Sequence, residues 1–127
     1  MPSTLKLMHE VGSGRRSQPA PPHIVFGALT QPNRDPQRPW LVLLDDETSP
    51  SITKAHKPDS VTWSSLWTKR PDAVIRFDLP PEQGGYGTDL RWTLHVGEPI
   101  PDAALLGHMR KRLYVLINAN LRYSFGQ

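Results

Sequence analysis

The stretch that decides the fold is residues 73–96, AVIRFDLPPEQGGYGTDLRWTLHV, in which two alternating runs flank a glycine-rich loop. Apolar side chains take every second position of each run: Ala73, Ile75, Phe77 and Leu79, then Leu90, Trp92, Leu94 and Val96. A period of two is typical of half-buried strands, and the loop joins them as an antiparallel hairpin with one wet face. We expect the charges on that face to form cross-strand pairs, Arg76 and Asp78 against Asp89 and Arg91.

The apolar face of this hairpin needs a partner surface, and residues 105–127, LLGHMRKRLYVLINANLRYSFGQ, supply one. On a helix that turns about 100° per residue, one face gathers Leu106, Met109, Leu113, Leu116, Ile117 and Asn120. Asp102 precedes the helix, where its carboxylate is expected to cap the first turn. Burial of each large apolar side chain contributes about 1.5–3 kcal/mol, so we predict that this helix packs on the sheet.

Asn120 is the polar exception on the apolar face of the helix. A core rarely keeps an amide without a hydrogen-bond partner. Two interpretations are open: a structural amide that bonds Trp63, Ser65 or a backbone carbonyl, or the polar contact of a molecule bound between sheet and helix. We favour the second.

The amino-terminal third predicts short elements. Loose alternation over residues 3–11 indicates a first strand that ends in GSGRRSQ. Prolines at positions 21 and 22 start a short helix that stops before Pro32. Residues 40–44, WLVLL, form either a second short helix or a buried strand, because periodicity cannot decide so short a run.

Residues 51–56 and 60–67 return to period two and predict two further strands, with Val61, Trp63, Ser65 and Trp67 on one inward face. The predicted fold class is therefore α+β: a curved antiparallel sheet of about five strands, two short helices after the first strand, and a long C-terminal helix on the sheet. At 127 residues, the chain is expected to form a single domain over 1–127.

Composition excludes several classes of function. There is no cysteine, which removes disulfides and thiol chemistry and is consistent with the cytoplasm, the expected location. The longest apolar run, Trp40–Leu44, is far below the roughly 20 residues of a membrane span, and no secretory leader is expected. The net charge of +3 is spread among interleaved acids and bases, so we do not expect nucleic acid as a partner.

Few side chains form patterns that carry catalytic or metal chemistry. The histidines, His9, His23, His56, His95 and His108, stand singly, so neither a metal site nor a cofactor is predicted. The GGYG run lacks the lysine of a phosphate loop and fits a hairpin loop better. Asp45, Asp46 and Glu47 form either a solvated turn or, near a cavity mouth, a carboxylate with a raised pKa that acts as an acid or base.

The order of these elements resembles the START-like, or SRPBCC, helix-grip superfamily, which includes pollen-allergen-like proteins and polyketide cyclases. Three segments carry the resemblance: PAPPHIVFGALTQP at 19–32, with Phe26 where a tryptophan is common; GGYGTDLRWTL at 84–94; and LLGHMRKRLYVLINANLR at 105–122. Members usually have six strands between the second helix and the last, whereas about four are found here. A homodimer is one way to cover the open sheet edge.

The resemblance implies a cavity for a hydrophobic or aromatic small molecule between the sheet and the last helix. The residues expected to line it are Trp63, Trp67, Phe77 and Trp92 from the sheet, and Met109, Arg110, Leu113 and Asn120 from the helix. Arg110 lies near the edge of the helix face, where its guanidinium can hold a carboxylate or phenolate. Two alternatives stay open: a cyclase- or dehydratase-like enzyme that uses an inward polar group, and a chaperone-activator-like interaction module.

Overall fold

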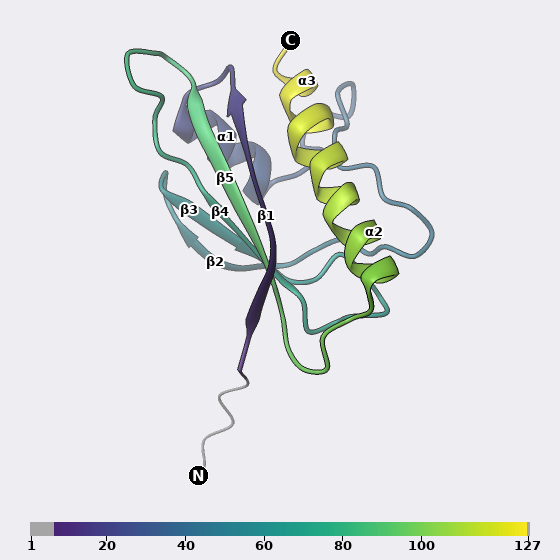
Figure 1. Cartoon of the computed structure of the whole chain (residues 1–127). Helices are drawn as coiled ribbons and strands as arrows, with labels where there is room; N and C mark the ends of the chain where they lie inside the picture. The colour runs from purple at the N-terminus through teal and green to yellow at the C-terminus, as the bar shows by residue number, and fades with distance from the viewer. Residues whose placement is uncertain (1–6, 127) are drawn as a thin grey trace.

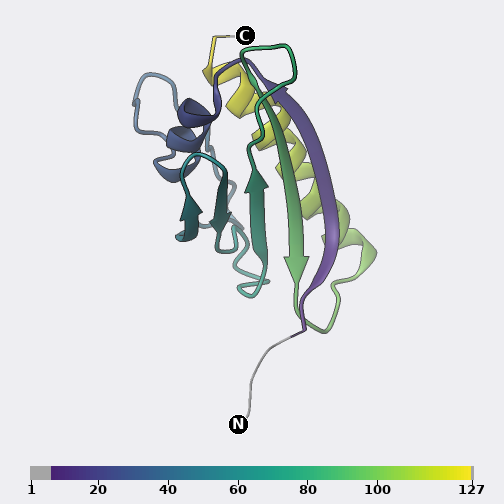
Figure 2. The same ribbon diagram turned by 90° about the vertical axis from the view of Figure 1, so that its left-hand side faces the viewer.

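The computed structural model describes residues 7–126 and has a five-stranded antiparallel sheet with a long helix across one face (Figure 1). The strands are β1 (His9–Gln18), β2 (Ile52–His56), β3 (Ser60–Trp63), β4 (Val74–Asp78) and β5 (Thr88–Val96), in the order β1-β5-β4-β3-β2. Helix α1 (Pro22–Thr30) follows β1, and the long helix runs through α2 (Ala103–Leu113), η1 (Tyr114–Leu121) and α3 (Arg122–Ser124). Figure 2 shows this helix behind the sheet. The predicted α+β helix-grip architecture with five strands is confirmed.

The β4–β5 hairpin forms as predicted. Its register places Phe77 opposite Trp92 and Ile75 opposite Leu94, and these four side chains are at most 1% exposed. The charge pairs on the wet face differ from the expected cross-strand pattern. Arg76 bonds Asp78 and Arg91 bonds Asp89, each within its own strand, because residues two apart lie on one face. The cross-strand bond comes from Arg15 of β1, which donates to Asp89 at 2.7 Å.

The first strand was predicted over residues 3–11, too early in the chain, because β1 continues through the whole GSGRRSQ segment to Gln18; residues 3–6 of the predicted strand lie outside the described residues. The glycines are needed inside the strand. A β-carbon at Gly14 would overlap the ring of Trp92, which lies against this backbone. At the strand's end, the buried amide of Gln18 donates to the carbonyl of Ile117 at 3.2 Å, which ties β1 to the long helix.

The predicted helix before Pro32 is confirmed by α1, whereas residues 40–50 form neither a helix nor a named strand. Side chains hold this segment instead. The Asn33 side-chain oxygen accepts from the backbone nitrogens of Trp40 and Leu41 at 2.8 and 2.9 Å, and its amide nitrogen donates to the Leu41 carbonyl at 2.9 Å. These side-chain bonds take the place of strand or helix hydrogen bonds, so the sequence has no hydrophobic period in this segment.

The strand predicted over 60–67 ends early, at Trp63. The hydroxyl of Ser65 accepts from the backbone nitrogen of Trp67 at 2.9 Å and turns the chain out of the sheet. All four residues predicted to face inward are still buried, which means that the core continues under this turn.

The long helix begins as predicted, with the Asp102 carboxylate accepting from the Leu105 nitrogen at 2.9 Å. Over Tyr114–Leu121 it is π-helical, with wider turns than an α-helix. A wheel of 100° per residue is therefore wrong beyond Leu113. The wider turns put Leu121 fully inside and leave Asn120 half-buried at the edge of the packed face.

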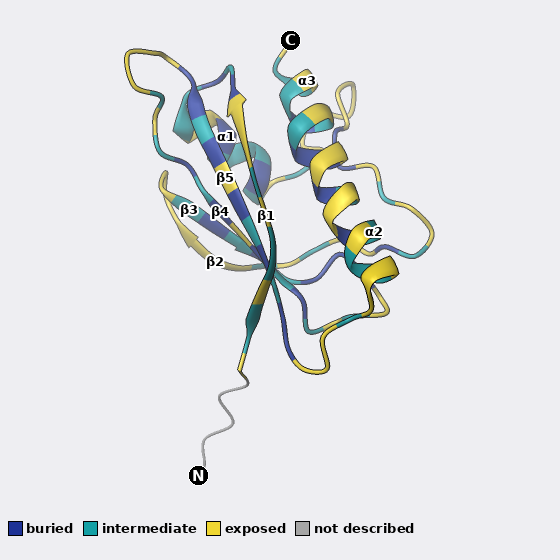
Figure 3. Cartoon of the chain, in the orientation of Figure 1, coloured by how far each residue is buried: buried dark blue, intermediate teal, exposed yellow. Residues whose placement is uncertain are grey.

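The core lies between the inner sheet face and the long helix, as the buried stripes in Figure 3 show. Its largest fully buried side chains include Trp63, Trp67, Trp92, Phe77, Met109 and Leu113. The indole nitrogen of Trp63 donates to the carbonyl of Leu29 at 2.9 Å and so fixes α1 to the sheet. No helix within residues 7–126 has the length and apolar character to cross a membrane.

Candidate functional site at the end of the long helix

Six of the eight residues predicted to contact a ligand are packed in the core. Trp63, Trp67, Phe77, Trp92, Met109 and Leu113 are each at most 1% exposed. They contact other protein groups directly. The rings of Trp63 and Phe77 pack edge to face with their centroids 4.7 Å apart, and those of Trp92 and Tyr114 do so at 5.6 Å. In this conformation, these side chains fill the space between sheet and helix.

Arg110, the seventh, lies at the edge of β1. Its Nε donates to the carbonyl of Val11 at 2.6 Å, and its side chain passes close to Gly12. The guanidinium therefore has a backbone partner and covers the strand beside the β-bulge between Glu10 and Gly12.

Asn120, the eighth, lines a pocket of about 440 Å³ between the long helix and the loop that follows α1. We call this the loop–helix pocket, and its walls are Gln37, Arg38, Pro39, Asn120, Tyr123, Ser124 and Gly126. The Asn120 amide nitrogen donates to the carbonyl of Trp40 at 3.3 Å. The bond to a backbone carbonyl makes Asn120 a structural amide, which is the first interpretation from the sequence. Asn120 also lines a pocket, but this pocket lies between the loop and the helix and not between the sheet and the helix, where the favoured interpretation placed a ligand.

A second pocket of about 210 Å³, the α1 pocket, adjoins the first and shares Arg38 and Ser124 with it. Its remaining walls come from α1, the loop and the carboxyl end: Ile24, Gly27, Ala28, Gln31, Arg34, Asp35, Trp40 and Phe125. The Trp40 ring stacks on Trp63 at 5.9 Å, and its indole nitrogen is buried without an acceptor among the described residues. The pocket wall is therefore continuous with the aromatic core.

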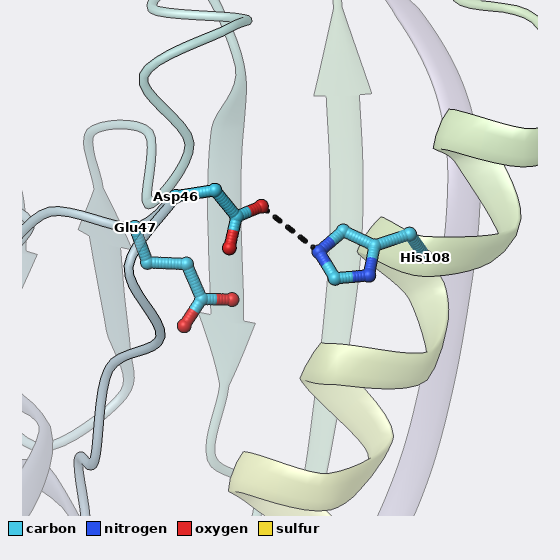
Figure 4. A group of neighbouring side chains, drawn as sticks. All are labelled: Asp46, Glu47 and His108. Carbon is cyan, nitrogen blue, oxygen red and sulfur yellow. Dashed lines mark hydrogen bonds and ion pairs between the residues drawn. The ribbon is translucent and has the colours of Figure 1, made fainter.

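Acidic and histidine side chains meet on the other flank of the long helix. One ligand-type atom from each of Asp46, Glu47 and His108 lies within 4.8 Å of the others, and His108 Nε2 is 3.0 Å from Asp46 (Figure 4). A sequence motif cannot reveal this group, because His108 lies 62 residues after Asp46. Carboxylates and an imidazole suit Zn²⁺ and related cations.

Glu47, however, is already bonded. Arg112 donates to both of its carboxylate oxygens at 2.7 and 2.8 Å, and the Leu44 nitrogen donates at 2.8 Å. The hydrogen bonds that Arg112 donates to Glu47 raise the pKa of Arg112, so the guanidinium stays charged beside any cation that approached. These contacts explain the group as a clamp that holds residues 44–48 on the helix. The predicted cluster of residues 45–47 therefore contacts the helix but away from both pockets.

A larger hollow of about 900 Å³ lies at the far end of β1, against the β4–β5 loop. Its walls are mainly charged or polar, and its acid Asp89 is held between Arg15 and Arg91, which lowers the pKa of Asp89. It lacks the aromatic and apolar lining that small-molecule sites usually have. The two pockets at the end of the long helix are better candidates for ligand binding.

No family model matches this sequence, and no curated protein matches it. Solved structures do match. CalU16 from Micromonospora echinospora superposes with a TM-score of 0.65 at 19% identity, covering 93% of this chain and 81% of that one. The Aha1 dimer from Colwellia psychrerythraea gives 0.62 at 16% identity, with 88% and 96% covered. Ara h 8.0201 gives 0.55 at 13% identity, with 95% and 100% covered.

At these identities the likeness defines the fold. The chain shares the helix-grip fold of these structures, and the sequence-based prediction of that fold is confirmed.

Sequence reasoning did not identify three pocket residues, Arg38, Trp40 and Tyr123. Arg38 and Trp40 belong to a segment without a period, and Tyr123 follows the π-helical turns that invalidate the helical wheel. The three prolines and one asparagine within residues 32–39 were the available signal, since such residues favour a fixed loop.

Proposed function

We propose that this protein binds a small apolar or aromatic molecule, and that the ligand lies in the loop–helix pocket and extends toward Trp40. The observation that carries the proposal is the position of Asn120, the predicted polar contact, in the wall of a 440 Å³ pocket beside an aromatic stack. Typical small-molecule sites have volumes of about 300–1,000 Å³ and combine apolar walls with a few polar groups.

The core aromatic residues support this site from behind. Trp40 stacks on Trp63, which in turn contacts Phe77, so the pocket wall rests on packed rings. A ligand would touch Trp63 or Phe77 only if Trp40 moved away from them. We therefore propose Asn120, Tyr123 and Trp40 as first contacts.

The test uses phenylnaphthylamine, a neutral aromatic dye that fluoresces when it leaves water. Ser124 lines both pockets, so Ser124→Leu should fill the shared wall and weaken dye binding at least about tenfold, a change of about 1.4 kcal/mol. Gly107→Leu is the matched control, because it adds the same side chain at an exposed helical position with open space around it. Equal binding by the two variants, or none by the wild type, would contradict the proposal.

Native mass spectrometry of freshly purified protein then searches for the natural ligand. A co-purified small molecule that is present in the wild type and in Gly107→Leu, but absent from Ser124→Leu, would support binding at this site. The enzyme alternative, the homodimer and the cytoplasmic location remain predictions from the sequence.

A further inference from the structure

The charges around the proposed site are unequal. Among the described residues, Arg38 and Tyr123 are the ionisable walls of the loop–helix pocket, and none of its described walls is acidic. The α1 pocket adds Arg34 and the acid Asp35. The described walls of the pocket that contains Asn120 therefore carry a positive charge at neutral pH.

Arg38 also differs from most arginines of this protein. Of the ten in the described chain, eight donate a side-chain hydrogen bond to a protein group; Arg16 and Arg38 do not. The nearby acid, Asp35, accepts from the backbone nitrogen of Gln37 at 2.9 Å and forms no ion pair with Arg38. Within residues 7–126, the donors of the Arg38 guanidinium have no protein acceptor, so they are available to a bound molecule.

The backbone that carries Arg38 is held in place from both sides. Its nitrogen donates to the carbonyl of Asp35 at 3.1 Å, and Asn33 fixes Trp40 and Leu41 just beyond it. Across the pocket, the amide of Asn120 bonds the Trp40 carbonyl. A guanidinium on a fixed loop loses less freedom when it binds, and its planar donors match a carboxylate or sulfonate.

The carboxyl end of a helix bears partial negative charge, which opposes an anion nearby. Here that charge is reduced, because the nitrogens of Phe125 and Gly126 donate to the carbonyls of Arg122 and Tyr123 at 3.2 and 3.0 Å. Arg38, on the facing loop, is the nearest full charge among the walls of this pocket.

We infer that the ligand of this site is an anionic aromatic molecule, with its ring against Trp40 and Tyr123 and its carboxylate or similar anionic group on Arg38. This inference rests on the proposed function. It adds that the ligand is negatively charged and that Arg38 binds its anionic group.

Two dyes with one skeleton separate the inference from the function. Anilinonaphthalene sulfonate is phenylnaphthylamine with an added sulfonate, so the difference between their dissociation constants reports the anionic group. We expect the wild type to bind the sulfonate about tenfold more tightly than the neutral dye, because a hydrogen bond to a charged group contributes about that much. Arg38→Gln should remove this preference and leave the neutral dye within about twofold.

Arg16→Gln is the matched control, because Arg16 is the other arginine without a side-chain partner in the described chain and lines a different hollow. It should change neither dye. Far-ultraviolet circular dichroism and thermal unfolding of each variant must match the wild type, since the sulfonate dye also binds loosened cores.

The outcomes are distinct. Equal affinity for the two dyes, or a sulfonate preference that survives Arg38→Gln, overturns the inference and leaves the proposed function standing. Absence of binding for both dyes overturns both. Loss of the preference in Arg38→Gln alone, with a sulfonate affinity that falls as salt rises, establishes the inference.

Discussion

The β4–β5 hairpin and residues 31–50 build the same core by different means. In the hairpin, every second side chain is buried and the backbone bonds neighbouring strands. In residues 31–50, the buried Trp40 and Leu41 are consecutive, Val42 beside them is 54% exposed, and the side chains of Asn33 and Glu47 bond the backbone. The regular region supplies the packed core, and the irregular one supplies walls of both pockets, among them Arg38, which has no side-chain partner among the described residues.

This difference separates stability from recognition. The hairpin has little freedom, because a shift by one residue would turn its apolar face to water. The loop is held by a few side-chain bonds at its ends, so the residues between them are free to serve binding. The predictions below test how strongly each region, and the contacts that join them, stabilise the fold.

The largest effect is expected at Trp63, which joins the two regions. Trp63→Ala removes the stack with Trp40, the contact with Phe77 and the bond to the Leu29 carbonyl. The free energy of unfolding, measured by urea denaturation, should fall by about 3–5 kcal/mol. Trp63→Phe keeps most of the ring and should cost clearly less. A loss below about 1 kcal/mol in Trp63→Ala would show that the regions are stabilised separately.

Second is the clamp on the irregular region. Arg112→Met leaves the fully buried carboxylate of Glu47 without its cation and should cost about 3 kcal/mol. His108→Ala, one turn earlier on the helix, removes a partly exposed pair with Asp46 and should cost at most about 1 kcal/mol. Equal losses in urea denaturation would mean that the Glu47–Arg112 bond has no special role.

Third is the close approach of β1 to Trp92. Gly14→Ala puts a methyl group into the indole ring and should cost about 1–3 kcal/mol through overpacking. Gly107→Ala is the control, since its β-carbon meets open space; it should be neutral or stabilising by up to about 1 kcal/mol. If the two variants have equal midpoints of thermal unfolding, Trp92 moves easily and the packing between β1 and β5 is less rigid than the structure indicates.

How much the sequence could predict follows the same division. Alternation identified the buried face of the hairpin correctly, because each residue there obeys a local period. The glycines of β1 misled the prediction, because Gly14 is required by the distant Trp92, and only the folded structure brings the two together. Residues 40–50 have a different cause: their backbone is bonded by the nearby side chains of Asn33 and Glu47, which leaves no periodic pattern.

The candidate site was predicted only in part. Asn120 was singled out correctly as an unusual residue, but the wheel placed it in the centre of the face instead of at its edge, because π-helical winding has no simple sequence signature. The core aromatic residues were expected to line a cavity, and their burial was predicted well. A sequence pattern gives burial but not whether buried side chains leave space between them.

The smallest effect concerns a clamp between an irregular segment and the end of the sheet. Arg70 donates to both oxygens of Asp72 at 2.8 and 2.7 Å, and Asp72 also accepts from the nitrogen of Gly97, directly after β5. The Arg70 bond, with help from Gly97, lowers the pKa of Asp72 from 3.8 to about 2. Because the folded-state pKa lies below the unfolded one, Asp72 stabilises the protein fully above about pH 4, and this contribution is lost as the pH falls toward 2.

Asp72→Asn should therefore lower the free energy of unfolding by about 1–2 kcal/mol at pH 7 and by much less at pH 2.5, as measured by urea denaturation at both values. The variant should also lose stability less steeply than the wild type between these two pH values. Asp78→Asn is the control, because its partner Arg76 is about half exposed and solvent screens the pair. An unchanged pH dependence in Asp72→Asn would mean that Arg70 binds the Gly97 and Pro99 carbonyls without help from Asp72, and that the Arg70 side chain alone joins this irregular segment to the sheet.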